Sequence, residues 1–148
     1  LVLNIDTRRI ARSAGITSED ICTENAIEKS CDKVQIPSGC EKEYVGDHIV
    51  SYSDVDLNGH TNNAMYLVWA MDAVGFAETS ASPLKEVRIN FNHETKPGEK
   101  VSLYRCMVGT EGQENTEDKA ETSHREGAVY YIEGEVDGHS AFCAELRF

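Results

Sequence analysis

The pattern of apolar and polar positions divides the chain into two parts. Residues 1–43 begin with a short alternating stretch, LVLNI at 1–5, and are otherwise mostly polar. This pattern predicts the end of a preceding strand followed by a linker, with one short helix near residues 18–29. From residue 44 onward, apolar residues recur with the periods of strands and of one helix. Residues 44–148 are therefore predicted to form the folded domain.

The longest apolar segment, NAMYLVWAMDAVGFAE at 63–78, predicts a helix. Asn62 or Asn63 can cap its first turn, because an asparagine oxygen accepts hydrogen bonds from free backbone N–H groups. Apolar residues lie on every side of this helix, and Asp72 is the only charged residue before Glu78. A helix without a polar face is enclosed by other structure, so we expect it at the centre of the fold.

Five further segments have the short, largely apolar pattern of β-strands. They are residues 44–53, 87–94, 101–108, 128–136 and 140–148. Asp137 and Gly138 form a two-residue hairpin signal between the last two of them. The order of elements is therefore a strand, a buried helix and four strands joined largely by tight turns.

An antiparallel sheet wrapped around one long central helix explains why the helix has no polar face. This arrangement is the hotdog architecture, and its fold class is α+β. A helix covered by one sheet still has a side to be closed. We therefore expect a second hotdog unit as a partner, either in tandem or in another copy of the chain.

Composition and charge exclude several function classes. The chain has 148 residues, of which 40% are apolar, and a formal net charge of −12. An acidic chain repels phosphates, so we expect no nucleic acid partner. No apolar run approaches the ~20 residues of a membrane span, and no leader pattern is present, so we expect a cytoplasmic protein. Because the first residue is Leu1 rather than Met, we also expect the chain to continue a longer polypeptide.

The cysteines favour neither a disulfide framework nor a metal site. Five are present, an odd number, and no two form a CxxC pair. Cys22, Cys31 and Cys40 recur every nine residues, but no His lies among them to complete a zinc site. We therefore expect reduced thiols, no bound metal and, in the absence of a nucleotide motif, no cofactor.

The segment before the helix, YSDVDLNGHTNNAMY at 52–66, concentrates groups that can carry chemistry. They are Asp56, Asn58, Gly59, His60, Asn62 and Asn63. Free backbone N–H groups at the start of a helix carry partial positive charge. Around Gly59 to Asn63 they can hold a carbonyl oxygen as it becomes anionic. Gly59 has no side chain to block the approach of a ligand. These residue types also fit an ordinary polar loop with helix caps.

The same segment resembles part of a known family. SDVDLNGHTNNAMYLVWAMD, residues 53–72, resembles the second half of the acyl-acyl carrier protein (acyl-ACP) thioesterases of plants and bacteria. The family's Asp-x-Asn-x-His pattern falls on Asp56, Asn58 and His60. The later segment INFNHETKPGEKVSLY resembles the family's next strand pair and carries its functional glutamate at Glu94. LNIDTRR, near the start of the chain, resembles the family's junction between two hotdog units.

The resemblance implies a thioester hydrolase that releases free fatty acid from acyl-ACP in fatty acid biosynthesis. Glu94 is then the base or nucleophile, and Asp56 orients Asn58 and His60, which position water and the thioester. His60 with Asp56 as its partner is the alternative base. Plant members carry a Cys directly after the glutamate, whereas Thr95 stands here, so a cysteine nucleophile at this position is excluded.

Two other functions fit the same residues. A single-hotdog enzyme acting on acyl-CoA esters also has an acidic loop before the helix, and Tyr52, Asp54 and Asp56 match it. A non-catalytic hotdog half that only binds a partner or an acyl chain is the third interpretation, because the family's first half supplies much of its acyl pocket. The Asn-x-His pattern and the LNIDTRR junction favour the acyl-ACP enzyme.

Overall fold

The computed structural model describes residues 2–3, 10–11, 31–109 and 127–148. The chain divides into two compact units, Leu1–Cys31 and Asp32–Phe148. In the first unit, the two-residue strands β1 (Val2–Leu3) and β2 (Ile10–Ala11) pair in antiparallel orientation. The helix predicted near residues 18–29 lies outside the described residues.

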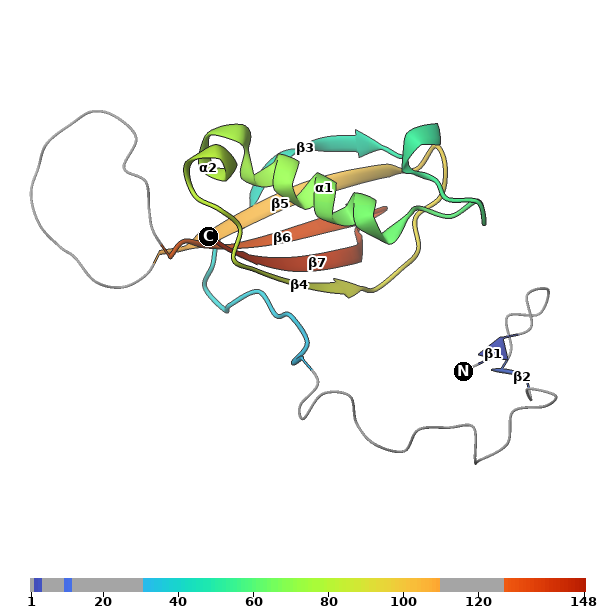
Figure 1. Ribbon diagram of the computed structural model, residues 1–148, viewed down its shortest axis with the longest axis horizontal. Helices are drawn as coiled ribbons and strands as arrows, with labels where there is room; N and C mark the ends of the chain where they lie inside the picture. Colours follow the sequence, from blue (N-terminus) through green and yellow to red (C-terminus); the bar gives the residue numbers. More distant parts are fainter. Residues whose placement is uncertain (1, 4–9, 12–30, 110–126) are drawn as a thin grey trace, which may run out of the picture. The chain divides into compact units, whose positions relative to one another are not determined.

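The second unit is built on a five-stranded antiparallel sheet with one helix across it (Figure 1). The strands are β3 (Glu43–Ile49), β4 (Glu86–Phe91), β5 (Lys100–Val108), β6 (Val129–Val136) and β7 (His139–Arg147), in the spatial order β3-β5-β6-β7-β4. The predicted hairpin joins β6 to β7, and Asp137 and Gly138 in its turn have φ angles of 49° and 77°. Positive φ at both positions is what a tight two-residue turn of this kind requires. The arrangement is the α+β hotdog predicted from the sequence.

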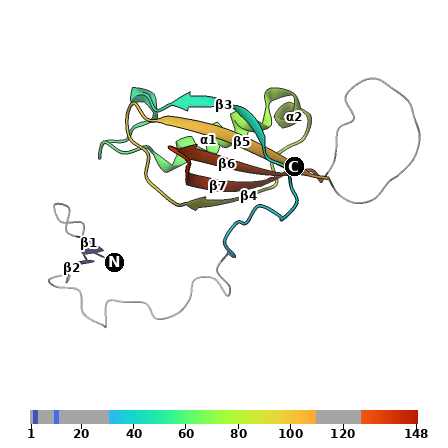
Figure 2. The same cartoon turned by 180° about the vertical axis from the view of Figure 1, so that it is seen from behind.

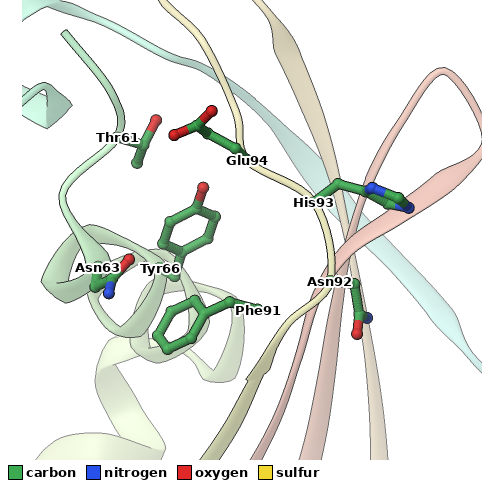
Figure 3. A pocket seen from close by; sticks show the side chains of 7 residues that line it. All are labelled: Thr61, Asn63, Tyr66, Phe91, Asn92, His93 and Glu94. Carbon is green, nitrogen blue, oxygen red and sulfur yellow. The ribbon is translucent and has the colours of Figure 1, made fainter. Parts of the chain in front are cut away.

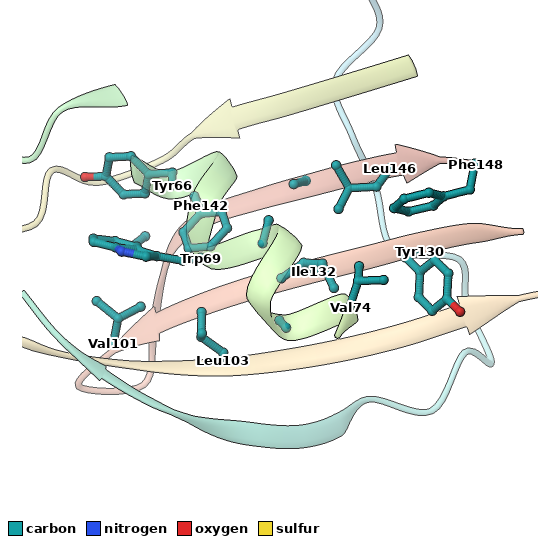
Figure 4. Close-up of a cluster of buried hydrophobic side chains, with 14 of the residues drawn as sticks. Tyr66, Trp69, Val74, Val101, Leu103, Tyr130, Ile132, Phe142, Leu146 and Phe148 are labelled. Atoms are coloured by element: carbon teal, nitrogen blue, oxygen red, sulfur yellow. The ribbon is translucent and has the colours of Figure 1, made fainter. Parts of the chain in front are cut away.

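The helix α1 (Asn63–Val74) crosses one face of this sheet and forms the core with it (Figure 4). Its buried residues are Tyr66, Trp69, Ala70, Ala73 and Val74. They pack with sheet residues that include Val101, Ile132, Phe142 and Leu146. The outer side of the helix is not buried in the same way, since Val68 on that side is 45% exposed. Within the described residues the helix is enclosed on one side only, because a single sheet covers a single face of it.

The helix ends four residues before the predicted end. Gly75 has a φ of 106°, and α1 stops at Val74, after which a short helix, α2 (Phe76–Ala81), begins. Glycine reaches positive φ at little cost, so it ends a helix readily. Arg105 of β5 donates from Nη1 to the carbonyl of Val74 at 3.1 Å, and from Nε to Glu43 at 2.9 Å. A cation at this end complements the helix dipole and ties α1 to the sheet.

Residues 32–42, which we name the strap, cover part of the other face of the sheet (Figure 2). Val34 is buried, and its backbone N–H and carbonyl both bond to the side-chain amide of Asn90, at 3.2 and 2.8 Å. Lys42 forms an ion pair with Glu133 at 2.8 Å. The strap therefore belongs to the same compact unit as the sheet.

A disulfide joins Cys40 in the strap to Cys106 of β5, with 6.1 Å between their Cα atoms. The prediction of reduced thiols is wrong for this pair. The sequence pattern missed it because the two cysteines are 66 residues apart and meet only when the strap lies on β5. Cys31 and Cys143 are free, and burial raises the pKa of the Cys143 thiol to about 11.

Candidate active site

Asp56 closes the loop that precedes α1. Its Oδ1 accepts hydrogen bonds from the backbone N–H groups of Asn58 at 2.8 Å and His60 at 3.4 Å, and its Oδ2 accepts from the Asn58 side chain at 3.3 Å. Gly59, with a φ of 78°, allows a tight turn in which its N–H bonds to the Asp56 carbonyl at 3.0 Å. The hydrogen bonds from Asn58 lower the pKa of the Asp56 carboxyl. Asp56 is therefore a weak base and an anchor for the loop.

The backbone N–H groups predicted to bind a carbonyl oxygen are mostly engaged. Gly59 and Asn62 donate to the carbonyls of Asp56 and Asp54, at 3.0 and 2.8 Å. The Asn62 side chain caps α1 by accepting a hydrogen bond from its first turn at 3.0 Å. Among the described residues, the backbone N–H of Asn63 has no acceptor. It is therefore the donor of this stretch that remains for a ligand.

Three buried hydroxyl groups join the start of α1 to the segment after β4. Thr95 is fully buried, and its Oγ1 lies 2.7 Å from Oγ1 of Thr61 and 3.0 Å from Oη of Tyr66. Thr61 also donates to the Thr95 carbonyl at 3.0 Å, and the Thr95 N–H donates to Tyr66 at 3.1 Å. This hydroxyl cluster of Thr61, Tyr66 and Thr95 fixes two chain segments against each other.

Beside the hydroxyl cluster, Nδ1 of His60 contacts Oε1 of Glu94. The strand predicted at 87–94 ends earlier, at Phe91, because the next two backbone N–H groups both donate to the carbonyl of Ala141, at 2.8 and 3.0 Å. Glu94 therefore comes from the loop that follows β4 and not from the strand itself. The side chains of His60 and Glu94 are 32% and 36% exposed, so both are accessible to a ligand.

A small pocket of about 140 Å³ lies at the start of α1 (Figure 3). Its lining residues are Thr61, Asn63, Tyr66, Phe91, Asn92, His93 and Glu94. The carboxylate of Glu94 lies beside Thr61 and the hydroxyl of Tyr66, whereas the His93 ring points away from them (Figure 3). Drug-sized ligands occupy pockets of about 300–1,000 Å³. The pocket therefore has room for a reacting group but not for a long acyl chain.

Two absences hold for the part of the chain that the structure describes. No group of three or more His, Cys, Asp or Glu side chains is arranged there to hold a metal ion. None of the helices found there has the length and apolar character that crossing a membrane requires.

Comparison with known proteins identifies the family. The sequence profile of the acyl-ACP thioesterase C-terminal domain matches residues 38–137. The chain belongs to the acyl-ACP thioesterase family. The matched range of this acyl-ACP thioesterase domain includes the loop before α1, the hydroxyl cluster and Glu94, and the resemblance seen in the sequence is confirmed. No curated protein matches the chain significantly.

Solved structures share the fold of this acyl-ACP thioesterase domain. An acyl-ACP thioesterase from Bacteroides thetaiotaomicron is 19% identical with a TM-score of 0.65, over 99% of this chain and 52% of that chain. A Thermus thermophilus thioesterase complexed with coenzyme A and Zn is 18% identical with a TM-score of 0.52, over 72% and 74% of the two chains. A Staphylococcus aureus protein in complex with CoA is 14% identical with a TM-score of 0.53, over 73% and 80%. These likenesses confirm the hotdog fold. The chain spans about half the length of the Bacteroides protein.

The structure of the acyl-ACP thioesterase domain brings some predicted site residues together and separates others. His60 contacts Glu94, whereas Asp56 reaches this pair through the backbone N–H of His60. Asn58 bonds to Asp56 and does not line the pocket, whereas Asn63 does. The catalytic roles of these residues stay predictions.

Sequence reasoning missed the hydroxyl cluster. No local signal marks Thr61 or Tyr66 as part of a site, because their partner Thr95 lies 34 and 29 residues away. Tyr66 sits within an apolar run, which indicates core packing rather than a hydrogen-bonding role.

Proposed function

We propose that this chain is the catalytic half of a thioester hydrolase that releases free fatty acid from acyl-ACP. The observation that carries the proposal is the contact between His60 and Glu94 at the positively charged start of α1. The pocket beside this contact has room for a thioester group. The family supports the acyl carrier protein as the partner that delivers the acyl chain.

Glu94 is the general base in this proposal. Its Oε1 contacts Nδ1 of His60, and the carboxylate lies at the pocket, beside Thr61 and the Tyr66 hydroxyl (Figure 3). The water transfers a proton to Glu94 while its oxygen bonds to the thioester carbon. The carbonyl oxygen becomes anionic and accepts a hydrogen bond from the Asn63 N–H. When the carbon–sulfur bond breaks, the sulfur leaves with the bonding electrons, and Glu94 returns the proton to it.

Asp56 has a supporting role in this mechanism. Its lowered pKa keeps the carboxylate ionised and makes it a poor base. Its hydrogen bonds to Asn58 and to the backbone of His60 instead hold the loop that presents His60 to Glu94.

Hydrolysis of acyl-ACP and acyl-CoA by the chain and its variants tests the proposal. Glu94→Gln keeps the size of the side chain and removes its basicity, so kcat should fall by about 10²–10⁴-fold. Asp56→Asn should lower kcat less, because Asp56 acts through His60. Glu78→Gln makes the same change on an exposed residue of α2 and should leave kcat unchanged. A wild-type rate of hydrolysis in a variant with both Asp56→Ala and Glu94→Ala would refute the mechanism.

The acyl-CoA enzyme is the second candidate, because two neighbours of the same fold hold coenzyme A. A kcat/KM for acyl-CoA above that for acyl-ACP would favour it. The cytoplasmic location stays a prediction, and the Cys40–Cys106 disulfide does not favour it, because disulfides are rare in cytosolic proteins.

We also propose a second hotdog unit as a partner. Val68 on the outer side of α1 and Phe91 on the edge strand β4 are 45% and 48% exposed, and the pocket is too small for an acyl chain. A second unit packed there would cover both residues and supply the missing wall of the acyl site. If this chain alone hydrolyses neither substrate while a longer chain with a preceding hotdog does, the third interpretation holds for the isolated half.

A further inference from the structure

We propose that the hydroxyl cluster sets the spacing between His60 and Glu94, with Thr95 as its central positioning residue. The catalytic consequence of this inference rests on the proposed function, whereas its structural consequence can be measured independently. Thr95 is fully buried and both of its hydroxyl contacts are within the cluster, so it touches no substrate.

The hydrogen bonds of the cluster have one consistent direction. Thr61 donates its single hydroxyl hydrogen to the Thr95 carbonyl, so it accepts in its 2.7 Å contact with the Thr95 hydroxyl. The Thr95 hydroxyl therefore donates to Thr61 and accepts from Tyr66 at 3.0 Å. The Tyr66 oxygen accepts the Thr95 N–H at 3.1 Å. Each hydroxyl then donates once and accepts once, and removal of one leaves a buried partner unsatisfied.

The cluster is joined directly to the proposed catalytic pair. His60 immediately precedes Thr61, and Glu94 immediately precedes Thr95. The His60 and Glu94 side chains are each about one third exposed, at 32% and 36%. A polar contact so exposed competes with water and holds its segments weakly. The buried hydrogen bonds next to it therefore determine how far apart the two segments lie.

Packing around Tyr66 gives the cluster a fixed reference point. The Tyr66 ring lies 5.1 Å from the Trp69 ring, 5.3 Å from Phe142 and 5.5 Å from Phe91, measured between centroids. A ring held on three sides presents its hydroxyl at one place. Thr95, which bonds to that hydroxyl through both its backbone and its side chain, is located against α1 as a result.

The experiment compares Thr95→Val, which keeps the shape and removes the hydroxyl, with Thr95→Ser, which keeps the hydroxyl. One readout is the ¹⁵N NMR signal of His60 Nδ1, for which Glu94→Gln supplies the value without the carboxylate contact. The other is kcat with acyl-ACP. Thr95→Val should move the signal toward the Glu94→Gln value and lower kcat by about 10- to 100-fold at nearly constant KM. Thr95→Ser should keep both the His60 signal and kcat close to their wild-type values.

Thr79→Val is the matched control, because it removes a hydroxyl that bonds to the Gly75 carbonyl at 3.0 Å, away from the site. It should leave the signal and kcat unchanged. A folded Thr95→Val variant with the wild-type His60 signal would overturn the inference, as would a Thr95→Ser variant as impaired as Thr95→Val.

A second variant covers the case in which Thr95→Val does not fold. Tyr66→Phe keeps the packed ring and removes one hydroxyl, so it should shift the His60 signal in the same direction by a smaller amount. An unchanged signal in Tyr66→Phe would overturn the inference. Full activity of Glu94→Gln would instead defeat the proposed function, and the NMR signal would still decide the structural role of the cluster.

Discussion

Gly134 of β6 has no room for a side chain. An added Cβ would lie 2.1 Å from Cε1 and 2.7 Å from Cδ1 of Phe142, its partner on β7. Phe142 is fully buried, and its ring packs against Tyr66 and Trp69 with centroids 5.3 and 6.4 Å away. The ring therefore cannot move aside freely, and Gly134→Ala should strain the core beneath α1.

The size of the effect follows from the packing. Overpacking a core costs about 1–3 kcal/mol, and we expect ~3 kcal/mol because the clash is with a rigid ring held by two neighbours. The entropy of unfolding, about 2.1 cal/mol/K per residue, is ~0.25 kcal/mol/K for a unit of about 120 residues. Gly134→Ala should therefore lower Tm by about 12 °C. Thermal unfolding followed by far-ultraviolet circular dichroism measures this shift.

Two comparisons test the cause. Gly46→Ala in β3 places a Cβ where no atom lies within 4 Å, so it should change Tm by less than about 2 °C. Phe142→Leu removes Cε1, the nearest clashing carbon, and replaces the rigid ring with a smaller flexible side chain, so Gly134→Ala should cost less in the Phe142→Leu background. Equal Tm values for Gly134→Ala and Gly46→Ala would refute the reasoning, as would a full cost of Gly134→Ala in the Phe142→Leu background.

Two further predictions concern acid and reducing conditions. Burial of Asp54 raises its pKa, but the hydrogen bonds from Ser51 and His48 outweigh burial, so the pKa is lowered overall. Because folding lowers its pKa, Asp54 stabilises the fold at pH values above the ordinary Asp pKa of about 3.9. This contribution to stability is lost as the pH falls through the lowered pKa. Calorimetry should show a Tm difference between wild type and Asp54→Asn that is constant down to about pH 5 and shrinks below about pH 4. A Tm difference that grows as the pH falls would contradict a lowered pKa of Asp54. Reduction of the Cys40–Cys106 disulfide should destabilise the fold by ~2–4 kcal/mol, about 8–16 °C in Tm, whereas Cys40→Ser should not respond to reductant. The same Tm for wild type with and without dithiothreitol would show that the disulfide constrains nothing.

Signals confined to a few adjacent residues predicted the local structure well. Asp137 and Gly138 form the expected turn, and Asn62 caps α1 as its residue type and position indicate. The predicted end of α1 is four residues too late. The residues after Gly75 continue a helical pattern, whereas the glycine itself adopts a positive φ and ends the helix. Glu94 was predicted on a strand because the alternation continues to that residue, but hydrogen bonds to Ala141 end the strand first.

Features that depend on distant residues could not be predicted. The Thr61–Thr95 contact spans 34 residues and the Cys40–Cys106 disulfide spans 66. Both threonines lie in segments that resemble the family, but their contact forms only when the helix start and the loop after β4 meet. The Asp56 to His60 pattern therefore located the candidate site, whereas the way in which that site is held together depends on the tertiary fold.

The hydrogen bonds between Asn90 and the backbone of Val34 have a consequence for any shortened form of the protein. A chain trimmed to begin at the first strand of the sheet would leave the Asn90 amide and the Cys106 thiol in water, and it would uncover the buried surface beneath the strap. Such a shortened chain would be more prone to aggregation through this uncovered face of the sheet, although its candidate active site would be unchanged. The smallest stable version of this half should therefore start upstream of Val34.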